Sequence, residues 1–253
     1  MRQLGLAALS LVVLGSCGGG RSRATGDPTT PELLKVKLCV DLDRQQELYL
    51  GRAGNGALTS QETAVWYDRM GVESGDLVPV WTRDATKAVV WTECTTTSCS
   101  GEVVLLDASG ESVKRVSLPS AGEASPGSAK IDVHSASIDG DQLWIYYDLP
   151  GVPQLNVGRD VRSLLAILNL PSLTVALEAD LGIRHGAAEL ASCVGNVARQ
   201  DIDCDTHQDI LVVTECAPAA CLDDASSKAC GGVRPKMTKA AWVERGEVYQ
   251  RVR

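Results

Sequence analysis

Short apolar runs rich in β-branched and aromatic residues recur along most of the chain, and polar turns separate them. A run of this kind opens each of four blocks, at residues 47–50, 88–91, 143–146 and 210–213. A second run follows in each block, at residues 64–67, 102–106, 163–168 and 240–243. Third runs lie at residues 77–80, 113–118, 173–177 and 247–252. Runs of this length and composition predict β-strands, so the chain is expected to be all-β.

Glycine with Asn, Asp or Arg stands between many of these runs. Such clusters occur at residues 54–56, 107–110, 139–141 and 244–246. They favour tight connections between neighbouring antiparallel strands. Longer loops are expected at residues 150–160 and 185–200, and helix only as single turns at residues 30–32 and 186–192.

The strands are too apolar for a single small sheet. A sheet of three or four antiparallel strands cannot bury two apolar faces by itself, and stacking such sheets around an axis gives each face a neighbour. The pattern therefore favours a propeller-like stack of about four small antiparallel sheets, with a β-sandwich as the alternative because it also uses many short strands. If the ring of sheets closes, residues 35–42 are expected to pair beside the C-terminal strands.

One block, residues 78–119, carries a family-like pattern. Its pattern residues are Pro79, Trp81, Asp84, the strand at residues 88–91, Asp107 and Gly110. In this order they resemble the WD40-like repeat of TolB-type bacterial β-propellers. The resemblance implies a sheet that packs face to face with its neighbours. Trp66, Trp81, Trp91 and Trp144 are then expected in the core rather than on a ligand-binding surface.

The first seventeen residues have the layout of a cleaved export signal. Arg2 precedes an apolar segment at residues 4–14, and small residues lead to Cys17. The segment is too short to cross the roughly 30 Å hydrocarbon layer as a helix. Leu14-Gly15-Ser16-Cys17 resembles the lipobox of bacterial lipoproteins, which implies that Cys17 becomes the acylated N-terminus. A plain secretory signal that is cut elsewhere is the alternative.

The predicted organisation is a signal peptide at residues 1–16, a flexible tether at 17–30 and a single β-rich domain at 31–253. The tether is rich in Gly and Ser and has no apolar period. Gly18 stands where an inner-membrane retention signal would carry Asp, so the outer membrane, facing the periplasm, is the expected location. Removal of the signal takes away only Arg2 among charged residues, and the net charge of −8 becomes −9. A nucleic acid is therefore not an expected partner.

Eight cysteines follow Cys17, an even number that suits disulfide pairing in an oxidising compartment. They are Cys39, Cys94, Cys99, Cys193, Cys204, Cys216, Cys221 and Cys230. The strings around Cys94 and Cys216 repeat Thr-Glu-Cys, each with a second cysteine five residues later, which predicts the hairpin pairs Cys94–Cys99 and Cys216–Cys221. By elimination, Cys39 is assigned to Cys230 and Cys193 to Cys204.

The strongest candidate for a metal-binding site is the acidic stretch at residues 201–209. Asp201, Asp203, Asp205 and Asp209 alternate around a short loop before a strand. Carboxylates in this arrangement can supply the oxygen ligands of a hard cation such as calcium. The stretch also resembles the calcium loop of FG-GAP-type propeller repeats, with Thr206 in place of the glycine of that family. The interpretation is a calcium ion acting as a structural clip, and a solvated acidic turn is the alternative.

Nothing in the sequence selects a catalytic group. It contains no Gly-x-Ser-x-Gly elbow, and His134, His185 and His207 lie in polar or turn segments. We therefore expect a non-enzymatic binding or scaffold module, held to the lipid bilayer through acylated Cys17, with an envelope protein or glycan as its partner. The alternative is an envelope hydrolase with its site in the mouth of a propeller.

Overall fold

The computed structural model describes residues 33–42, 60–81, 86–127, 129–154, 158–223 and 230–252. These residues belong to one compact unit, Glu32–Arg253, which is built mainly from β-strands. The predicted signal peptide, Cys17, the tether and the run at residues 47–50 lie outside the described residues. Among the helices in the described ranges, none is both long and apolar enough to cross a bilayer.

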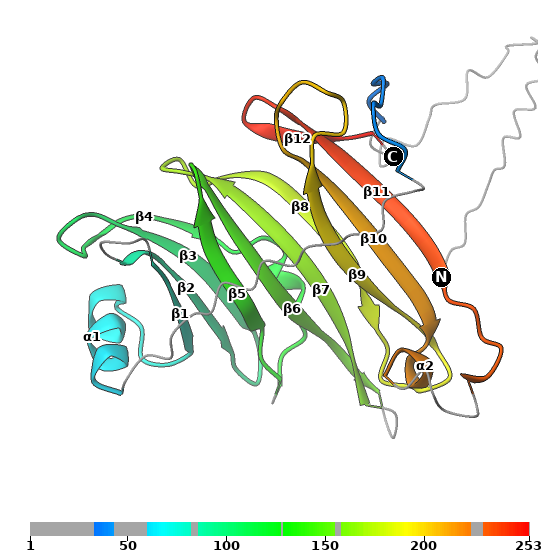
Figure 1. Ribbon diagram of the computed structural model, residues 1–253. Helices are drawn as coiled ribbons and strands as arrows, with labels where there is room; N and C mark the ends of the chain where they lie inside the picture. The colour runs from blue at the N-terminus through cyan, green and yellow to red at the C-terminus, as the bar shows by residue number, and fades with distance from the viewer. Residues whose placement is uncertain are drawn as a thin grey trace, which may run out of the picture. The chain divides into compact units, whose positions relative to one another are not determined.

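Twelve strands form three four-stranded antiparallel sheets, and each sheet takes its strands consecutively from the chain (Figure 1). Sheet A contains β1 (Asp76–Trp81), β2 (Thr86–Cys94), β3 (Cys99–Leu106) and β4 (Ser112–Ser117). Sheet B contains β5 (Asp132–Asp139), β6 (Gln142–Gln154), β7 (Gly158–Asn169) and β8 (Thr174–Arg184). Sheet C contains β9 (Ala191–Gln200), β10 (Asp209–Pro218), β11 (Lys236–Arg245) and β12 (Val248–Arg251). Two α-helices and one 3₁₀ turn complete the described elements: α1 (Ser60–Met70), η1 (Ala121–Glu123) and α2 (Ala219–Asp223).

Sheet B lies between sheets A and C and is buried on both faces. Along β7, Leu164, Ala166 and Leu168 face sheet A, whereas Leu165 and Ile167 face sheet C. This follows from the two-residue period of a strand, which sends successive side chains to opposite faces. The prediction that apolar strands are covered on both faces is confirmed.

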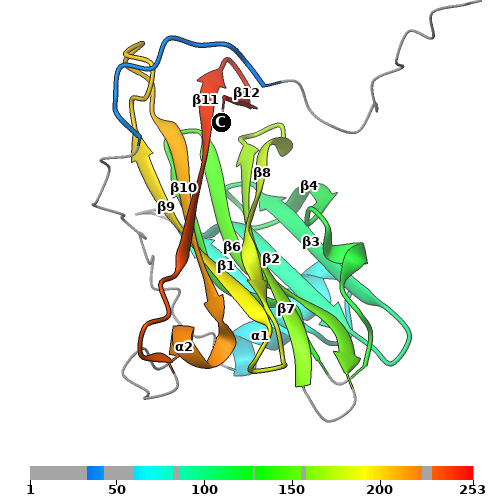
Figure 2. The same cartoon turned by 90° about the vertical axis from the view of Figure 1, so that its right-hand side faces the viewer.

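The two outer faces of the stack are covered by other elements. Helix α1 lays Trp66 and Met70 against the outer face of sheet A. The outer face of sheet C packs against residues 33–42, through Leu34, Val36 and Val40. Figure 2 shows this segment, in blue, crossing the end of sheet C at which the β9–β10 loop lies. The described part of the chain is thus a stack of three sheets between two covering layers, one sheet more than a β-sandwich, and it does not show a closed ring.

Most strand predictions for the last three blocks are confirmed, since residues 88–91, 143–146 and 210–213 lie in β2, β6 and β10. Their predicted partners lie in β3, β7 and β11, and the third runs lie in β4, β8 and β12. The turns predicted at residues 107–110, 139–141 and 244–246 connect β3 to β4, β5 to β6 and β11 to β12.

The strand predicted at residues 64–67 is wrong, because this run belongs to helix α1. Trp66 and Met70 are four residues apart and therefore lie on one helical face, where both are buried. Val65 is exposed, and Gly71 follows the helix with φ +66°, the left-handed conformation typical of a helix end. The helical turn predicted at residues 186–192 is also wrong, since residues 185–190 are a non-helical turn, and the loop predicted at residues 185–200 is wrong from residue 191 onward, where β9 pairs with β10. The long loop predicted at residues 150–160 is wrong at both ends, because β6 runs to Gln154 and β7 begins at Gly158.

Residues 35–42 do not form a strand. The segment contacts β12 and the loop between β9 and β10 instead. The backbone N–H of Leu34 donates to the carbonyl oxygen of Arg251 at 2.8 Å, and the N–H of Cys39 donates to that of Ile202 at 2.9 Å. Residues 77–80 are a strand as predicted, but they lie in β1, the first strand of sheet A, rather than in an earlier block. Trp66, Trp91 and Trp144 are buried in the core, as predicted for them.

Sheets B and C come closest where β8 passes β9. A Cβ atom on Gly195 would lie 2.3 Å from the carbonyl oxygen of Leu181, and one on Gly182 would lie 2.3 Å from that of Cys193. No side chain fits at such distances, so glycine at both positions allows the two backbones to approach.

Every cysteine after Cys17 is paired, in four disulfides (Cys39–Cys204, Cys94–Cys99, Cys193–Cys216 and Cys221–Cys230). The predicted pair Cys94–Cys99 is confirmed and joins facing residues of β2 and β3.

The other three predicted pairs, Cys216–Cys221, Cys193–Cys204 and Cys39–Cys230, are wrong. The chain does not turn back after Cys216, because β10 runs on to Pro218 and α2 follows. Cys216 therefore pairs with Cys193, which faces it on β9. Cys221, on α2, pairs with Cys230, and Cys39 pairs with Cys204.

Candidate metal centre

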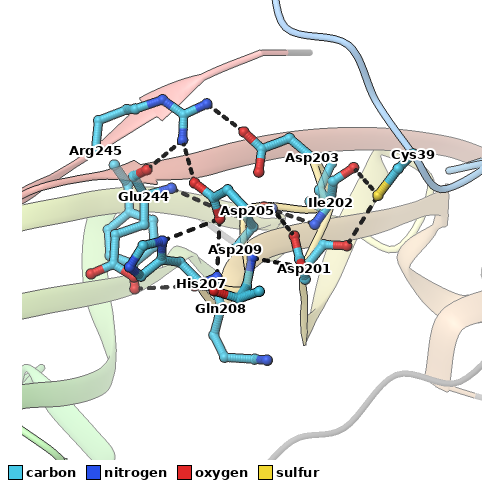
Figure 3. Close-up of polar contacts among 12 residues, drawn as sticks. Cys39, Asp201, Ile202, Asp203, Asp205, His207, Gln208, Asp209, Glu244 and Arg245 are labelled. Atoms are coloured by element: carbon cyan, nitrogen blue, oxygen red, sulfur yellow. Dashed lines mark hydrogen bonds and ion pairs between the residues drawn. The ribbon is translucent and has the colours of Figure 1, made fainter.

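The acidic loop, residues 201–208, connects β9 to β10 (Figure 3). Cys204 and Thr206 have φ values of 62° and 76°, in the left-handed region. Thr206 is the position at which the calcium-loop family carries glycine, so the backbone adopts the turn conformation without that residue. The disulfide from Cys204 to Cys39 holds the loop against residues 33–42.

Asp209 is fully buried and joins the loop to β11. One carboxylate oxygen accepts the backbone N–H of Ile202 at 2.8 Å, and the other accepts that of Glu244 at 2.8 Å (Figure 3). Burial raises the pKa of the Asp209 carboxyl above its ordinary value, and the two N–H groups act in the opposite direction. Burial likewise raises the pKa of Glu244.

Asp201 shapes the loop from its other end. Its two carboxylate oxygens accept the backbone N–H groups of Asp205 at 3.1 Å and Thr206 at 2.9 Å. These bonds use one lone pair of each oxygen and leave others available, because a carboxylate oxygen can accept more than one contact.

Arg245, at the end of β11, supplies the positive charge of the site. Its guanidinium donates to one oxygen of Asp203 and, at 2.9 Å, to Asp205. The ion pair with Asp203 raises the pKa of Arg245. Asp205 also accepts the backbone N–H of His207 at 3.0 Å, which lowers the pKa of its carboxyl.

Asp203 is the least satisfied member of the group. Its side chain is 4% exposed, and its second carboxylate oxygen, Oδ1, is buried without a hydrogen-bond partner in the part of the chain that the structure describes. A buried carboxylate oxygen is costly to leave without a positive or donating neighbour.

Three of the four predicted ligands come together. Asp201, Asp203 and Asp209 each offer a carboxylate oxygen, and these atoms lie within 4.8 Å of one another. Asp205 does not belong to this group, and its carboxylate contacts Arg245 and His207 instead. The residues therefore fit a hard cation such as calcium with three carboxylate ligands, and the unpartnered oxygen of Asp203 is the atom best placed to gain from one.

All three histidines lie beside carboxylates. The closest approaches are His134 Nε2 to Asp148 at 2.8 Å, His185 Nδ1 to Asp160 at 3.2 Å and His207 Nδ1 to Asp205 at 3.2 Å. Ser163 also donates to Asp148, at 2.6 Å, so Asp148 lies between the serine and His134. In a Ser-His-Asp triad the histidine is the central group, so this order differs from that of a triad.

Comparison with protein-family models, with curated proteins and with solved structures finds no match to this chain.

Proposed function

We propose that the protein is a lipid-anchored module of the cell envelope that binds or organises another envelope component without catalysing a reaction. The observation that carries this proposal is that all eight cysteines after Cys17 form disulfides. Four disulfides need an oxidising compartment, which agrees with the export signal and lipobox-like sequence at residues 1–17. The all-β stack gives such a module a rigid framework.

The intact mass of the protein extracted from membranes tests this proposal. We expect a chain that starts at Cys17, carries acyl chains on that residue and gains two hydrogens for each of four disulfides on reduction. An unmodified Cys17, or thiols that are free before reduction, contradicts the proposed anchor or compartment. Replacement of Cys17 by Ala is the matched control, and the mass of this variant is expected to show no acyl chains.

We also propose that the three sheets are an open arc of a propeller-like stack. Support comes from sheets that are antiparallel meanders and pack face to face. Five layers at about 10 Å each put exposed Val65 on α1 and exposed Leu38 in the opposite covering layer about 40 Å apart. Spin labels on noncanonical amino acids at these two positions measure that distance. A value near one layer spacing would instead indicate a closed ring.

A second proposal concerns the acidic loop, which we infer to take up calcium as a structural clip. The close carboxylates of Asp201, Asp203 and Asp209 and the unpartnered oxygen of Asp203 support it. Calcium is expected to raise the Tm of the wild-type protein and to lose this effect in Asp203→Asn. Asp205→Asn is the matched control, because Asp205 lies outside the three-carboxylate group, and it should keep the response. An equal response in wild type and Asp203→Asn contradicts the site.

A further inference from the structure

The four disulfides differ in how well a reductant can reach them. Cys39 and Cys204 are both exposed. The other six paired cysteines are half-buried or buried among the strands and α2. Thiol–disulfide exchange requires a thiolate to approach one of the two sulfur atoms, so access controls its rate. We therefore expect an external dithiol to reduce the disulfide Cys39–Cys204 before the other three.

This disulfide joins two segments that lie far apart in the sequence. Cys39 belongs to residues 33–42, which cover the outer face of sheet C, and Cys204 belongs to the acidic loop. Figure 3 shows the Cys39 sulfur beside the loop, 3.3 Å from the carbonyl oxygen of Ile202.

Apart from the disulfide, few backbone hydrogen bonds hold residues 33–42 in the described structure. Their backbone is not part of a sheet, and within the described residues it shares two backbone hydrogen bonds with the rest of the fold, from Leu34 and Cys39. Lys239 adds a side-chain bond to the carbonyl oxygen of Leu42. Buried Leu42 and half-buried Leu34, Val36 and Val40 add apolar contacts with sheet C. A segment with so few backbone bonds opens locally at low cost once its covalent link is removed.

We propose that Cys39–Cys204 is a redox latch that sets the length of the membrane tether. Reduction of this bond, ahead of the other three, releases residues 33–42 from sheet C. The segment lies two residues after the predicted tether at 17–30, so its release adds ten residues to that predicted connection. At about 3.5 Å per extended residue, the domain gains up to about 35 Å of reach from the membrane. The statement about the membrane rests on the proposed lipid anchor.

The chemistry is a two-electron exchange with a dithiol protein or reagent. One thiolate of the dithiol attacks Cys39 or Cys204, the bond between the two cysteines breaks, and the departing sulfur takes up a proton as a thiol. The second thiol of the reductant then attacks the mixed disulfide and releases the other cysteine. The reductant ends as a disulfide, and Cys39 and Cys204 end as two thiols.

Differential alkylation tests the order of reduction. The mature chain, residues 17–253 with Cys17→Ala, is incubated in its oxidised form with increasing dithiothreitol, alkylated, and mapped by peptide mass spectrometry. We expect Cys39 and Cys204 to be half-alkylated at a reductant concentration at least about tenfold below that of the other six cysteines. Earlier alkylation of another pair, or reduction of all four bonds together, overturns the proposal.

Hydrogen exchange of the same samples tests the release. Selective reduction should remove protection at the amides of Leu34 and Cys39, while β6 and β7 stay protected. The variant Cys39→Ser/Cys204→Ser should reproduce the reduced pattern, and Cys94→Ser/Cys99→Ser, a hairpin pair, should leave residues 33–42 protected. Unchanged protection of residues 33–42 after selective reduction overturns the latch even if either variant fails to fold, because the wild-type chain gives the result.

The latch and the anchor can fail separately. Selective reduction and release are measured on the unlipidated chain and do not depend on Cys17. If mass analysis of the membrane extract shows no acyl chains but reduction still releases residues 33–42, the proposed lipid anchor is wrong. The redox latch then stands without its effect on the distance from the membrane. If acylation is found and reduction is not selective, the latch alone is wrong.

Discussion

Asp209 links the acidic loop to β11 through two backbone N–H groups, and it does so from a fully buried position. Asparagine at this position can accept only one of those bonds, because its amide nitrogen faces the other donor. We expect Asp209→Asn to lower the free energy of unfolding by about 2 kcal/mol, the usual cost of a buried unsatisfied group. Urea unfolding at neutral pH measures the change.

The same variant tests the pKa of Asp209. Burial raises this pKa in the folded protein, so the folded state binds a proton at a higher pH than the unfolded chain. The stabilising contribution is present below the unfolded pKa and declines as pH rises through the folded pKa. Asp209→Asn removes this decline.

Asp107 is a control of opposite sign. The Ser109 hydroxyl lowers the pKa of Asp107, so the contribution of Asp107 to stability is lost as pH falls, and Asp107→Asn should remove that loss. Unchanged pH dependence in Asp209→Asn contradicts the assignment.

At the residue scale, the sequence predicted the acidic side of the site and missed its basic side. Asp201, Asp203 and Asp209 could be identified because they lie within nine residues of one another. Arg245 could not, because it reaches the loop from the far end of β11, and only the strand pairing brings it there.

At the element scale, the passage of β8 beside β9 depends on two glycines. Alanine at Gly195 would bring its Cβ within 2.3 Å of the Leu181 carbonyl oxygen, so one of the two backbones must move. We expect Gly195→Ala to destabilise the fold by about 3 kcal/mol, as an overpacked core position does. Gly122→Ala is the control, because its Cβ would meet no atom within 4 Å. Thermal unfolding compares the two, and equal Tm values contradict the close approach.

Helix α1 covers sheet A through Trp66 and Met70, of which Trp66 is the larger side chain. Trp66 is 8% exposed and packs in the cluster with Met70 and Trp91. We expect Trp66→Ala to cost about 3–5 kcal/mol, the usual range for removing a buried tryptophan. Val65→Ala is the matched control, since Val65 is 45% exposed and its loss should cost below about 0.5 kcal/mol. Denaturant unfolding measures both, and similar losses would mean that α1 is not packed on the sheet.

The elements that were predicted correctly are those whose apolar runs are continuous, such as β7 and β10, because such runs are buried on both faces. Strands β5 and β9 were not predicted, because Ser and Asp interrupt the apolar residues of β5, and Gly195 and polar residues interrupt those of β9. Helix α1 was mistaken for a strand because four adjacent apolar or aromatic residues contain no visible period, and only the buried pair Trp66 and Met70 identifies the helical face.

At the scale of the whole molecule, the disulfides differ in how much chain they enclose. The sequence separations are 165 for Cys39–Cys204, 23 for Cys193–Cys216 and 5 for Cys94–Cys99. Chain entropy predicts losses of roughly 5, 3.5 and 2 kcal/mol when both cysteines of each pair are replaced by serine. Urea unfolding of the three double variants measures the order. A reversed order would mean that effects in the folded state outweigh the entropy of the unfolded chain.

The stacking of sheets could be predicted in outline because local runs determine each sheet and apolar faces require neighbours. The predicted disulfide between Cys216 and Cys221 was wrong because the chain differs locally from that at Cys94 and Cys99. Their spacing matches that of Cys94 and Cys99, but a hairpin in one place and a helix in the other give the two pairs different partners. Such choices depend on where a strand ends, which the cysteine spacing does not specify.

Because each sheet uses consecutive strands, sheet A needs no strand beyond residue 117 and sheet B none beyond residue 184. Residues 33–42, by contrast, need later parts of the chain to reach their final place. They emerge before any sheet, yet the surface they cover and the cysteine they join belong to sheet C and the loop at residue 204. Cys94, Cys99 and Cys193 therefore lie between Cys39 and its partner in the sequence, and residues 33–42, the first described segment of the domain, can reach their final place only after sheet C has formed.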